Sequence, residues 1–158
     1  MRAVVKGYRP QEEIDAERER EEAAERARQR AIRQAEHEQA ADACRRLASS
    51  GRPPDCMIEV EQRRSFWSSA TCFRPLTPAW FLGYISVDGI GGESTFIHGC
   101  AYGQDGRFYV AGDTYPERRA LRVYQPSKPP PWGSPELTRR AERMLSGEIE
   151  SHWDEETP

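Results

Sequence analysis

The sequence predicts an α+β protein in which a long polar helix precedes an antiparallel meander sheet of about five to six strands. A charged stretch bounded by Pro10 and Gly51 has helical character throughout. Between residues 57 and 125 the pattern changes to short alternating segments rich in aromatic and β-branched residues. A proline-rich stretch and a short amphipathic segment follow, and they predict a C-terminal helix packed on the sheet.

The length of the chain favours one compact core with an appendage. The chain has 158 residues, of which 31% are charged and only 37% hydrophobic, so part of it must be strongly solvated. We predict four segments: a helical appendage over 1–52, a β core over 53–125, a linker and helix over 126–147, and a tail over 148–158. The final 25 residues hold 3 basic and 7 acidic side chains, which makes the tail acidic.

Residues 10–49 are predicted to form one helix. Pro10 suits its first turn, acidic residues crowd its N-terminal end, and Arg45 and Arg46 lie near its C-terminal end. Its apolar stripe is mostly alanine, which buries too little area to hold a coiled coil by itself. Forty helical residues reach about 60 Å, more than the width of such a domain. Much of the helix must therefore project or lie on something else.

The predicted strands are short and closely spaced. They cover residues 57–62, 66–73, 79–87, 95–102, 107–112 and 120–125. Gln104-Asp105-Gly106 is the best hairpin signal in the chain. Because no connection is long enough for a helical crossover, an antiparallel meander is the simplest topology.

The segment DGIGGESTFIHGC, residues 88–100, raises the question of a phosphate-binding loop. It lacks the lysine of a P-loop, and its glycines lead into a strand rather than a helix, so a dinucleotide fingerprint also fails. Glycines at 89, 91 and 92 suit a hairpin loop that needs positive φ. The segment is predicted to be a turn.

The C-terminal part begins with the linker at residues 126–133. Ser134 is predicted as the N-cap of a helix that runs to about Ser146 and Gly147. Leu137, Ala141, Met144 and Leu145 form an apolar face that suits the sheet.

An enzymatic alternative rests on four residues near strand ends. His98 and Cys100 share a strand face, and Asp88 and Asp113 lie at turns. Together they could form a small metal-dependent hydrolase, with Cys72 or Cys56 as a further ligand. Turn-forming aspartates and a buried histidine beside an inert thiol explain the same residues without catalysis. No established catalytic or cofactor-binding motif is present, so we expect no cofactor, no bound metal and no enzyme activity.

The densest basic run contains the residues we predict to contact a partner. On a helix Arg26, Arg30 and Arg33 share one face, which could contact an acidic protein surface or nucleic-acid phosphates. The acidic residues upstream disfavour nucleic acid, which stays the alternative.

The aromatic residues exceed what one face of a small sheet needs. The segment 79–87 is apolar on both faces, with Trp80, Leu82 and Tyr84 predicted on one and Phe81, Ile85 and Val87 on the other. Either helices cover both faces or one face binds a partner. We predict that Trp80, Trp132 and Trp153 belong to the partner-binding surface, with intramolecular docking of the linker and tail as the alternative.

The functional expectation is a stoichiometric protein-binding module. No apolar run resembles a secretory signal or a membrane span, and four dispersed cysteines suit reduced thiols, so we expect a cytoplasmic protein. The build resembles that of many small phage or mobile-element proteins that inhibit a host complex or serve as minor assembly components. The partner would be a protein or a host macromolecular complex.

Overall fold

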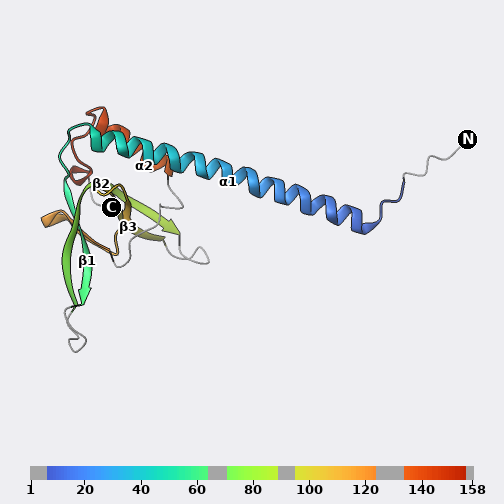
Figure 1. Ribbon diagram of the computed structural model, residues 1–158, viewed down its shortest axis with the longest axis horizontal. Coiled ribbons are helices and arrows are strands. Elements are labelled where there is room, and N and C mark those ends of the chain that lie inside the picture. The colour runs from blue at the N-terminus through green and yellow to red at the C-terminus, as the bar shows by residue number, and fades with distance from the viewer. Residues whose placement is uncertain (1–6, 64–70, 89–94, 124–133, 156–158) are drawn as a thin grey trace, which may run out of the picture. The chain divides into compact units, whose positions relative to one another are not determined.

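A computed structural model describes residues 7–63, 71–88, 95–123 and 134–155. The α+β class is confirmed (Figure 1). The elements are α1 (Gln11–Ser49), β1 (Cys56–Arg63), β2 (Thr71–Asp88), β3 (Thr95–Gly103), β4 (Phe108–Val110), β5 (Asp113–Tyr115), η1 (Pro116–Arg118), β6 (Ala120–Val123), α2 (Ser134–Leu145) and η2 (His152–Asp154).

The chain divides into two compact units, Met1–Ala35 and Glu36–Pro158, so the division falls within the unbroken helix α1. The helix begins one residue after Pro10 and ends just before Gly51, as the sequence predicts. None of the helices in the described ranges is long and apolar enough to cross a membrane.

The sheet has six strands in the order β4-β3-β2-β1-β6-β5. Strands β1 to β4 form the predicted antiparallel meander, and the Gln104-Asp105-Gly106 hairpin joins β3 to β4. The chain then returns to the other side, where β6 pairs with β1 in parallel. This single parallel pair departs from the predicted meander. A helix is not needed to connect the parallel strands β1 and β6, because β2 to β5 lie between them in the sequence.

Strand β2 is longer than expected, because the predicted break at residues 74–78 does not exist. Pro75 and Pro78 both lie within it. The register between β1 and β2 shifts at Ile58 and Glu59, so that Leu76 is an extra residue on β2. A bulge of this kind accommodates prolines, which cannot donate to the ladder. Residues 66–70 of the predicted strand lie outside the described residues, as does the predicted turn at 89–94, although β2 and β3 pair antiparallel on either side of it.

A second bulge, at Gly83, corrects the predicted faces of β2. Gly83 has a φ of 89° and breaks the register with β3. The extra residue shifts the alternation by one position, so that Leu82 and Ile85 share one face, whereas Tyr84 packs on the other with Phe81. Strict alternation had placed Tyr84 with Leu82.

The sheet separates two apolar clusters. The helix-side cluster joins Ala40, Ala43, Cys44 and Leu47 of α1 to Leu137, Ala141 and Met144 of α2 and to Trp80, Leu82, Ile85, Cys100, Tyr102 and Phe108 of the sheet. The second cluster, on the opposite face of the sheet, contains Cys56, Ile58, Ala79, Phe81, Ala101, Tyr109, Ala111, Leu121 and Val123. The helices therefore cover one face, with α2 on the sheet as predicted, and Tyr84 and Trp153 pack against the cluster on the other.

The C-terminal segment is not a free acidic tail over the residues that are described. Ser151 and His152 are buried, and Trp153 packs against the second cluster. The Arg52 guanidinium donates to the carbonyls of Ile149 and Glu150 at 3.4 and 3.2 Å. Residues 149–153 are therefore held on the chain both by the packing of Trp153 and by the hydrogen bonds from Arg52.

The Gly83 bulge yields a stability prediction with a matched control. A Cβ at residue 83 would lie 2.7 Å from Nη1 of Arg140, whereas one at Gly51, with a similar φ of 84°, would meet nothing within 4 Å. Gly51→Ala should cost about 1–2 kcal/mol through backbone strain alone. Gly83→Ala should cost about 3 kcal/mol or more, because Arg140 also loses hydrogen bonds. Urea unfolding measures both, and equal losses would contradict the packing described.

Candidate functional site

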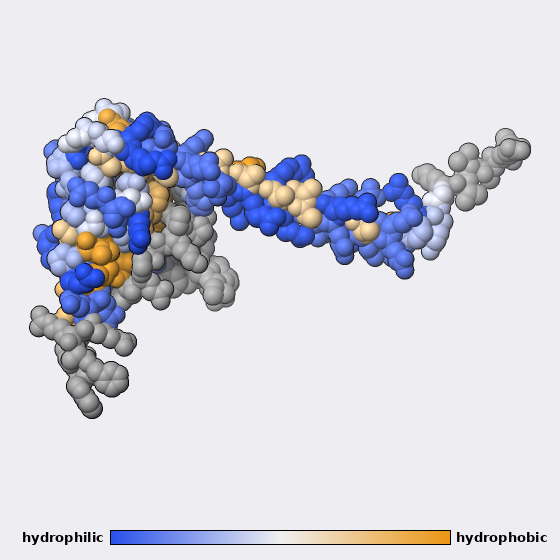
Figure 2. All heavy atoms as spheres, in the orientation of Figure 1, coloured by the Kyte–Doolittle hydropathy of each residue, from blue (hydrophilic) through white to orange (hydrophobic). Residues whose placement is uncertain are grey.

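The first two thirds of α1 form the most exposed surface of the described chain. Every side chain from residue 11 to residue 35 is exposed except the half-buried Ala16. Figure 2 shows this part of the helix as largely hydrophilic, with a row of weakly hydrophobic residues along it. Ile14 and Ile32 are its largest apolar side chains, and they are 37% and 52% exposed. Residues 11–35 are therefore not held in a helix by burial against other described residues of the chain.

The predicted basic face is present on this exposed helix. Arg26, Arg30 and Arg33 follow one another at spacings of four and three residues, which places them on one side. The Arg26 guanidinium lies 3.8 Å from Glu22, with both side chains more than half exposed. Arg30 and Arg33 form no ion pair within the described ranges. The structure thus brings the three arginines together and leaves two of them available to an external anion.

The three tryptophans predicted for partner binding fall in different environments. Trp80 is 2% exposed in the helix-side cluster, and its indole N–H donates to the Arg52 carbonyl at 3.1 Å. Trp80 is therefore not part of a binding surface, which corrects the prediction: its ring is buried and its N–H has an acceptor, both within the chain. Trp132 lies outside the described residues.

Trp153 is docked within the chain. Its ring stacks on Phe81 with centroids 3.7 Å apart, and its N–H donates to the Asp55 carbonyl at 3.0 Å. It remains half-buried. These contacts agree with the alternative to partner binding, in which the C-terminal tail docks within the chain.

The residues of the predicted alternative, a small metal-dependent hydrolase, do not form a catalytic or metal-binding group among the described residues. Burial raises the pKa of the fully buried Cys100 to about 12, so its thiol is neutral and a poor nucleophile. The half-buried His98 has Nδ1 3.0 Å from the Ala111 carbonyl oxygen. Asp113 begins β5, and the side chain of Asp88 is outside the described set. Across the described ranges no three His, Cys, Asp or Glu side chains are grouped so as to hold a metal ion.

A depression of about 360 Å³ is lined by Asp55, a carboxylate that could in principle act in binding or catalysis. The Asp55 carboxylate accepts the Phe81 N–H at 2.8 Å and the Ser151 hydroxyl at 2.5 Å. Burial raises the pKa of Asp55, although both hydrogen bonds oppose the rise. Because each carboxylate oxygen already has a partner, Asp55 holds the C-terminal segment in place.

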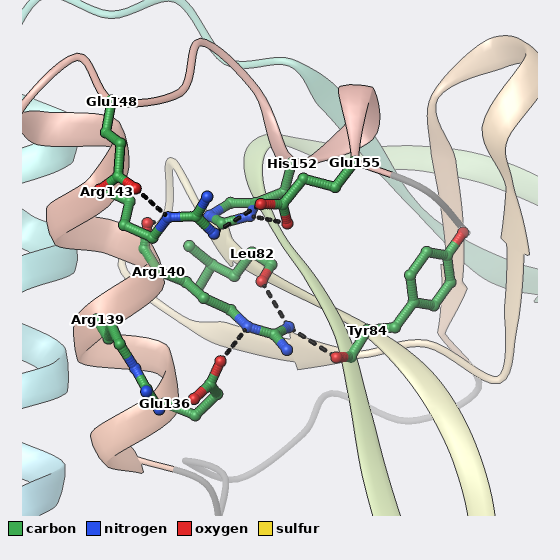
Figure 3. A network of polar contacts seen from close by, with 9 residues as sticks. All are labelled: Leu82, Tyr84, Glu136, Arg139, Arg140, Arg143, Glu148, His152 and Glu155. Atoms are coloured by element: carbon green, nitrogen blue, oxygen red, sulfur yellow. Dashed lines mark hydrogen bonds and ion pairs between the residues drawn. The ribbon is translucent and has the colours of Figure 1, made fainter. Parts of the chain in front are cut away.

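Sequence reasoning missed the polar network around Arg140, which Figure 3 shows. The Arg140 guanidinium donates from Nη1 to the carbonyls of Leu82 and Tyr84, at 3.0 and 2.7 Å, on either side of the Gly83 bulge. Glu136, one turn earlier on α2, accepts from Arg140 Nε at 2.9 Å and fixes its direction. An arginine on a short helix gives no sequence signal for such a role, because its partners are backbone atoms of a bulge.

The same network holds the C-terminal residues. His152, 2% exposed, has Nε2 2.9 Å from the Arg140 carbonyl and Nδ1 2.9 Å from the Glu155 carboxylate. Arg143 donates to the other Glu155 oxygen at 2.6 Å. Both ring nitrogens of His152 are thus engaged by the fold, which makes the histidine structural.

Comparison with known proteins provides no relative from which a function could be transferred: no protein family, curated protein or solved structure matches this chain.

The C-terminal network predicts a pH-dependent effect of Glu155→Gln. The hydrogen bond from His152, together with Arg143, lowers the pKa of Glu155 below its ordinary 4.5. A lowered pKa means that the folded state favours the ionised carboxylate, so this stabilisation is present above pH 4.5 and is lost as the pH falls through the lowered pKa. The variant should unfold more easily than the wild type at pH 7, and the difference should close in acid.

Glu148→Gln is the control, because Glu148 also contacts Arg143 but has a side chain 63% exposed. Urea unfolding at pH 7 and well below pH 4.5 measures both variants. A difference for Glu155→Gln that does not change with pH would contradict the assigned interaction.

Proposed function

We propose that this chain is a non-enzymatic protein-binding module that docks stoichiometrically on a larger complex through the exposed helix. The observation that carries the proposal is the exposure of α1 from residue 11 to residue 35, with Arg26, Arg30 and Arg33 on one side. These residues are helical without burying an apolar face, so the surface is formed before any partner arrives. A preformed helix loses little conformational freedom on binding, which favours its use for docking.

The chemistry of the basic face favours an acidic partner surface. Arginine presents a planar, permanently charged fork of donors that matches carboxylates in two-point contacts. Apolar contacts can contribute less, because the neighbouring side chains are mainly alanine. Binding should therefore weaken as salt is added, although less steeply than for a ligand that releases condensed counterions.

Nucleic acid is the second candidate partner, and the same arginines support it. Glu12, Glu13, Glu17, Glu19, Glu21, Glu22 and Glu25 lie on the same helix upstream. Their charge would repel a phosphate backbone that followed the helix beyond the basic run. A protein surface of limited extent avoids this repulsion, which is why we place the protein partner first.

We expect charge reversal of Arg26, Arg30 and Arg33 to glutamate to lower partner affinity at least about tenfold, since several charge-assisted contacts would become repulsive. The matched control reverses the exposed Arg45, Arg74 and Arg107, which changes the net charge equally at other sites. Nuclease-treated affinity capture from the native host identifies the partner, and calorimetry then measures its affinity for all three proteins.

Two results would contradict the proposal. Equal partner affinity for the wild type and the Arg26, Arg30 and Arg33 variant would exclude the basic face. Material recovered only when nuclease is omitted, with affinity falling steeply in salt, would assign the face to nucleic acid.

A further inference from the structure

The charges on the exposed part of α1 are arranged with opposite signs about its midpoint. Glu12, Asp15 and Glu19 precede the midpoint, and Arg26, Arg30 and Arg33 follow it. Numbered from the two ends, the residues match as Glu12 with Arg33, Asp15 with Arg30 and Glu19 with Arg26. In each match the two residue numbers add to the same value.

Two further matches obey the same rule, whereas Glu13, Arg18, Glu21 and Glu22 match uncharged residues. Glu17 corresponds to Arg28 and Arg20 to Glu25, again with opposite charges. No match between residue 12 and residue 33 joins like charges. An acidic half followed by a basic half would suit any antiparallel partner of the same kind, and the most direct such partner is the same helix.

The charged residues also lie on the correct side of the helix for such a pairing. At 3.6 residues per turn, Glu12, Asp15, Glu19, Arg26, Arg30 and Arg33 fall within a sector of about 60°. A row of alanines, Ala16, Ala23, Ala27 and Ala31, occupies the adjacent sector. We call this charged sector the flank of the alanine row. When two such helices pack antiparallel with their alanine rows in contact, the flank of one helix lies against the flank of the other. Alanine side chains let the backbones approach closely enough for flanking side chains to touch.

We propose that residues 11–35 of α1 pair with the same segment of a second copy of this chain, antiparallel and about a twofold axis near residues 22 and 23. The twofold axis makes each of the three flank ion pairs twice. A parallel pairing in register would instead set every charge against its like. The isologous contact closes on itself, so it ends at a dimer.

The interactions within one chain leave these groups available for the pairing. Glu12, Glu19, Arg30 and Arg33 form no ion pair within the described residues, and the hydrogen bond of Asp15 is to the neutral amide of Gln11 at 3.0 Å. Arg26 has only the long contact to Glu22. The alanine row buries little apolar area, so the dimer depends on its ion pairs and is weak and sensitive to salt.

The proposal rests on the proposed function in placing binding at this helix, and it adds a second copy of the chain as a competing occupant of the same face. Because the dimer uses the same three arginines as docking on another protein, the two associations compete. Self-association would thus keep the basic face occupied until a partner with a stronger acidic surface displaces the second copy.

The experiment is sedimentation equilibrium of the full chain and two charge variants. The wild type should form a dimer whose dissociation constant rises at least about tenfold between about 50 mM and 500 mM salt. The acidic variant carries Arg26→Glu, Arg30→Glu and Arg33→Glu, and the basic variant carries Glu12→Lys, Asp15→Lys and Glu19→Lys. Each alone should be monomeric, since its flank then bears one sign. An equimolar mixture should form a heterodimer, and circular dichroism verifies that each variant keeps its helix.

The orientation is tested by a photo-reactive residue in place of Ala31. Antiparallel pairing predicts cross-links to residues 12–16 of the second copy, and cross-links between the two residues at position 31 would contradict it. Wild type that stays monomeric at low salt, a variant that dimerises as well as the wild type, or a mixture that does not associate would each overturn the proposal.

Failure of this inference can be told apart from failure of the proposed function. A monomeric wild type that still captures an acidic protein through the three arginines refutes the dimer and leaves the docking function standing. A salt-sensitive dimer that captures no other protein supports the pairing and removes the docking on a larger complex.

Discussion

The contact between Arg140 and the Gly83 bulge is the interaction on which the folded core depends. The bulge turns two carbonyls of β2 toward α2, where a single guanidinium satisfies both. Only glycine leaves room for it, because a Cβ would lie 2.7 Å from Nη1. The same residue offers its own carbonyl to His152, so the contact joins β2, α2 and the C-terminal segment. The bulge also decides which apolar residues of β2 face the helices.

That choice of face determines how α1 is held. Leu82 and Ile85 form, with α2, the surface on which Ala40, Ala43 and Leu47 pack. Residues 36–49 are therefore fixed by burial, and the Ser134 hydroxyl lies 2.6 Å from Nδ1 of His37 at the start of that stretch. Residues 11–35 continue the helix without such support, and propensity and pairs along the helix such as Glu25–Arg28, at 2.8 Å, must maintain them. The buried residues of α1 thus all lie in its C-terminal third, and its N-terminal two thirds carry the exposed charges.

The sequence predicted what depends on local patterns. The bounds of α1, the start and apolar face of α2 and the Gln104-Asp105-Gly106 hairpin follow from caps, periodicity and turn residues, and the structure confirms them. The unpredicted features depend on contacts between distant segments. Pro75 suggests a strand break by its type, but a bulge accommodates it within β2, and Tyr84 changes face because the bulge at Leu82 and Gly83 adds one residue to β2. Trp153 was ambiguous because its acidic neighbours gave no sign of the Phe81 ring on which it stacks. The face of Arg26, Arg30 and Arg33 was predictable because it needs only the helical repeat.

The central claim is that the fold buries one side of residues 36–49 of α1, whereas residues 11–35 are helical but exposed and gain protection only on association. Amide hydrogen exchange followed by mass spectrometry over a range of protein concentrations tests it most directly. The account predicts strong protection of residues 36–49 at every concentration, and protection of residues 11–35 that rises with concentration at low salt and disappears at high salt. Equal protection of both parts in dilute solution, or concentration-dependent protection elsewhere in the chain, would contradict it.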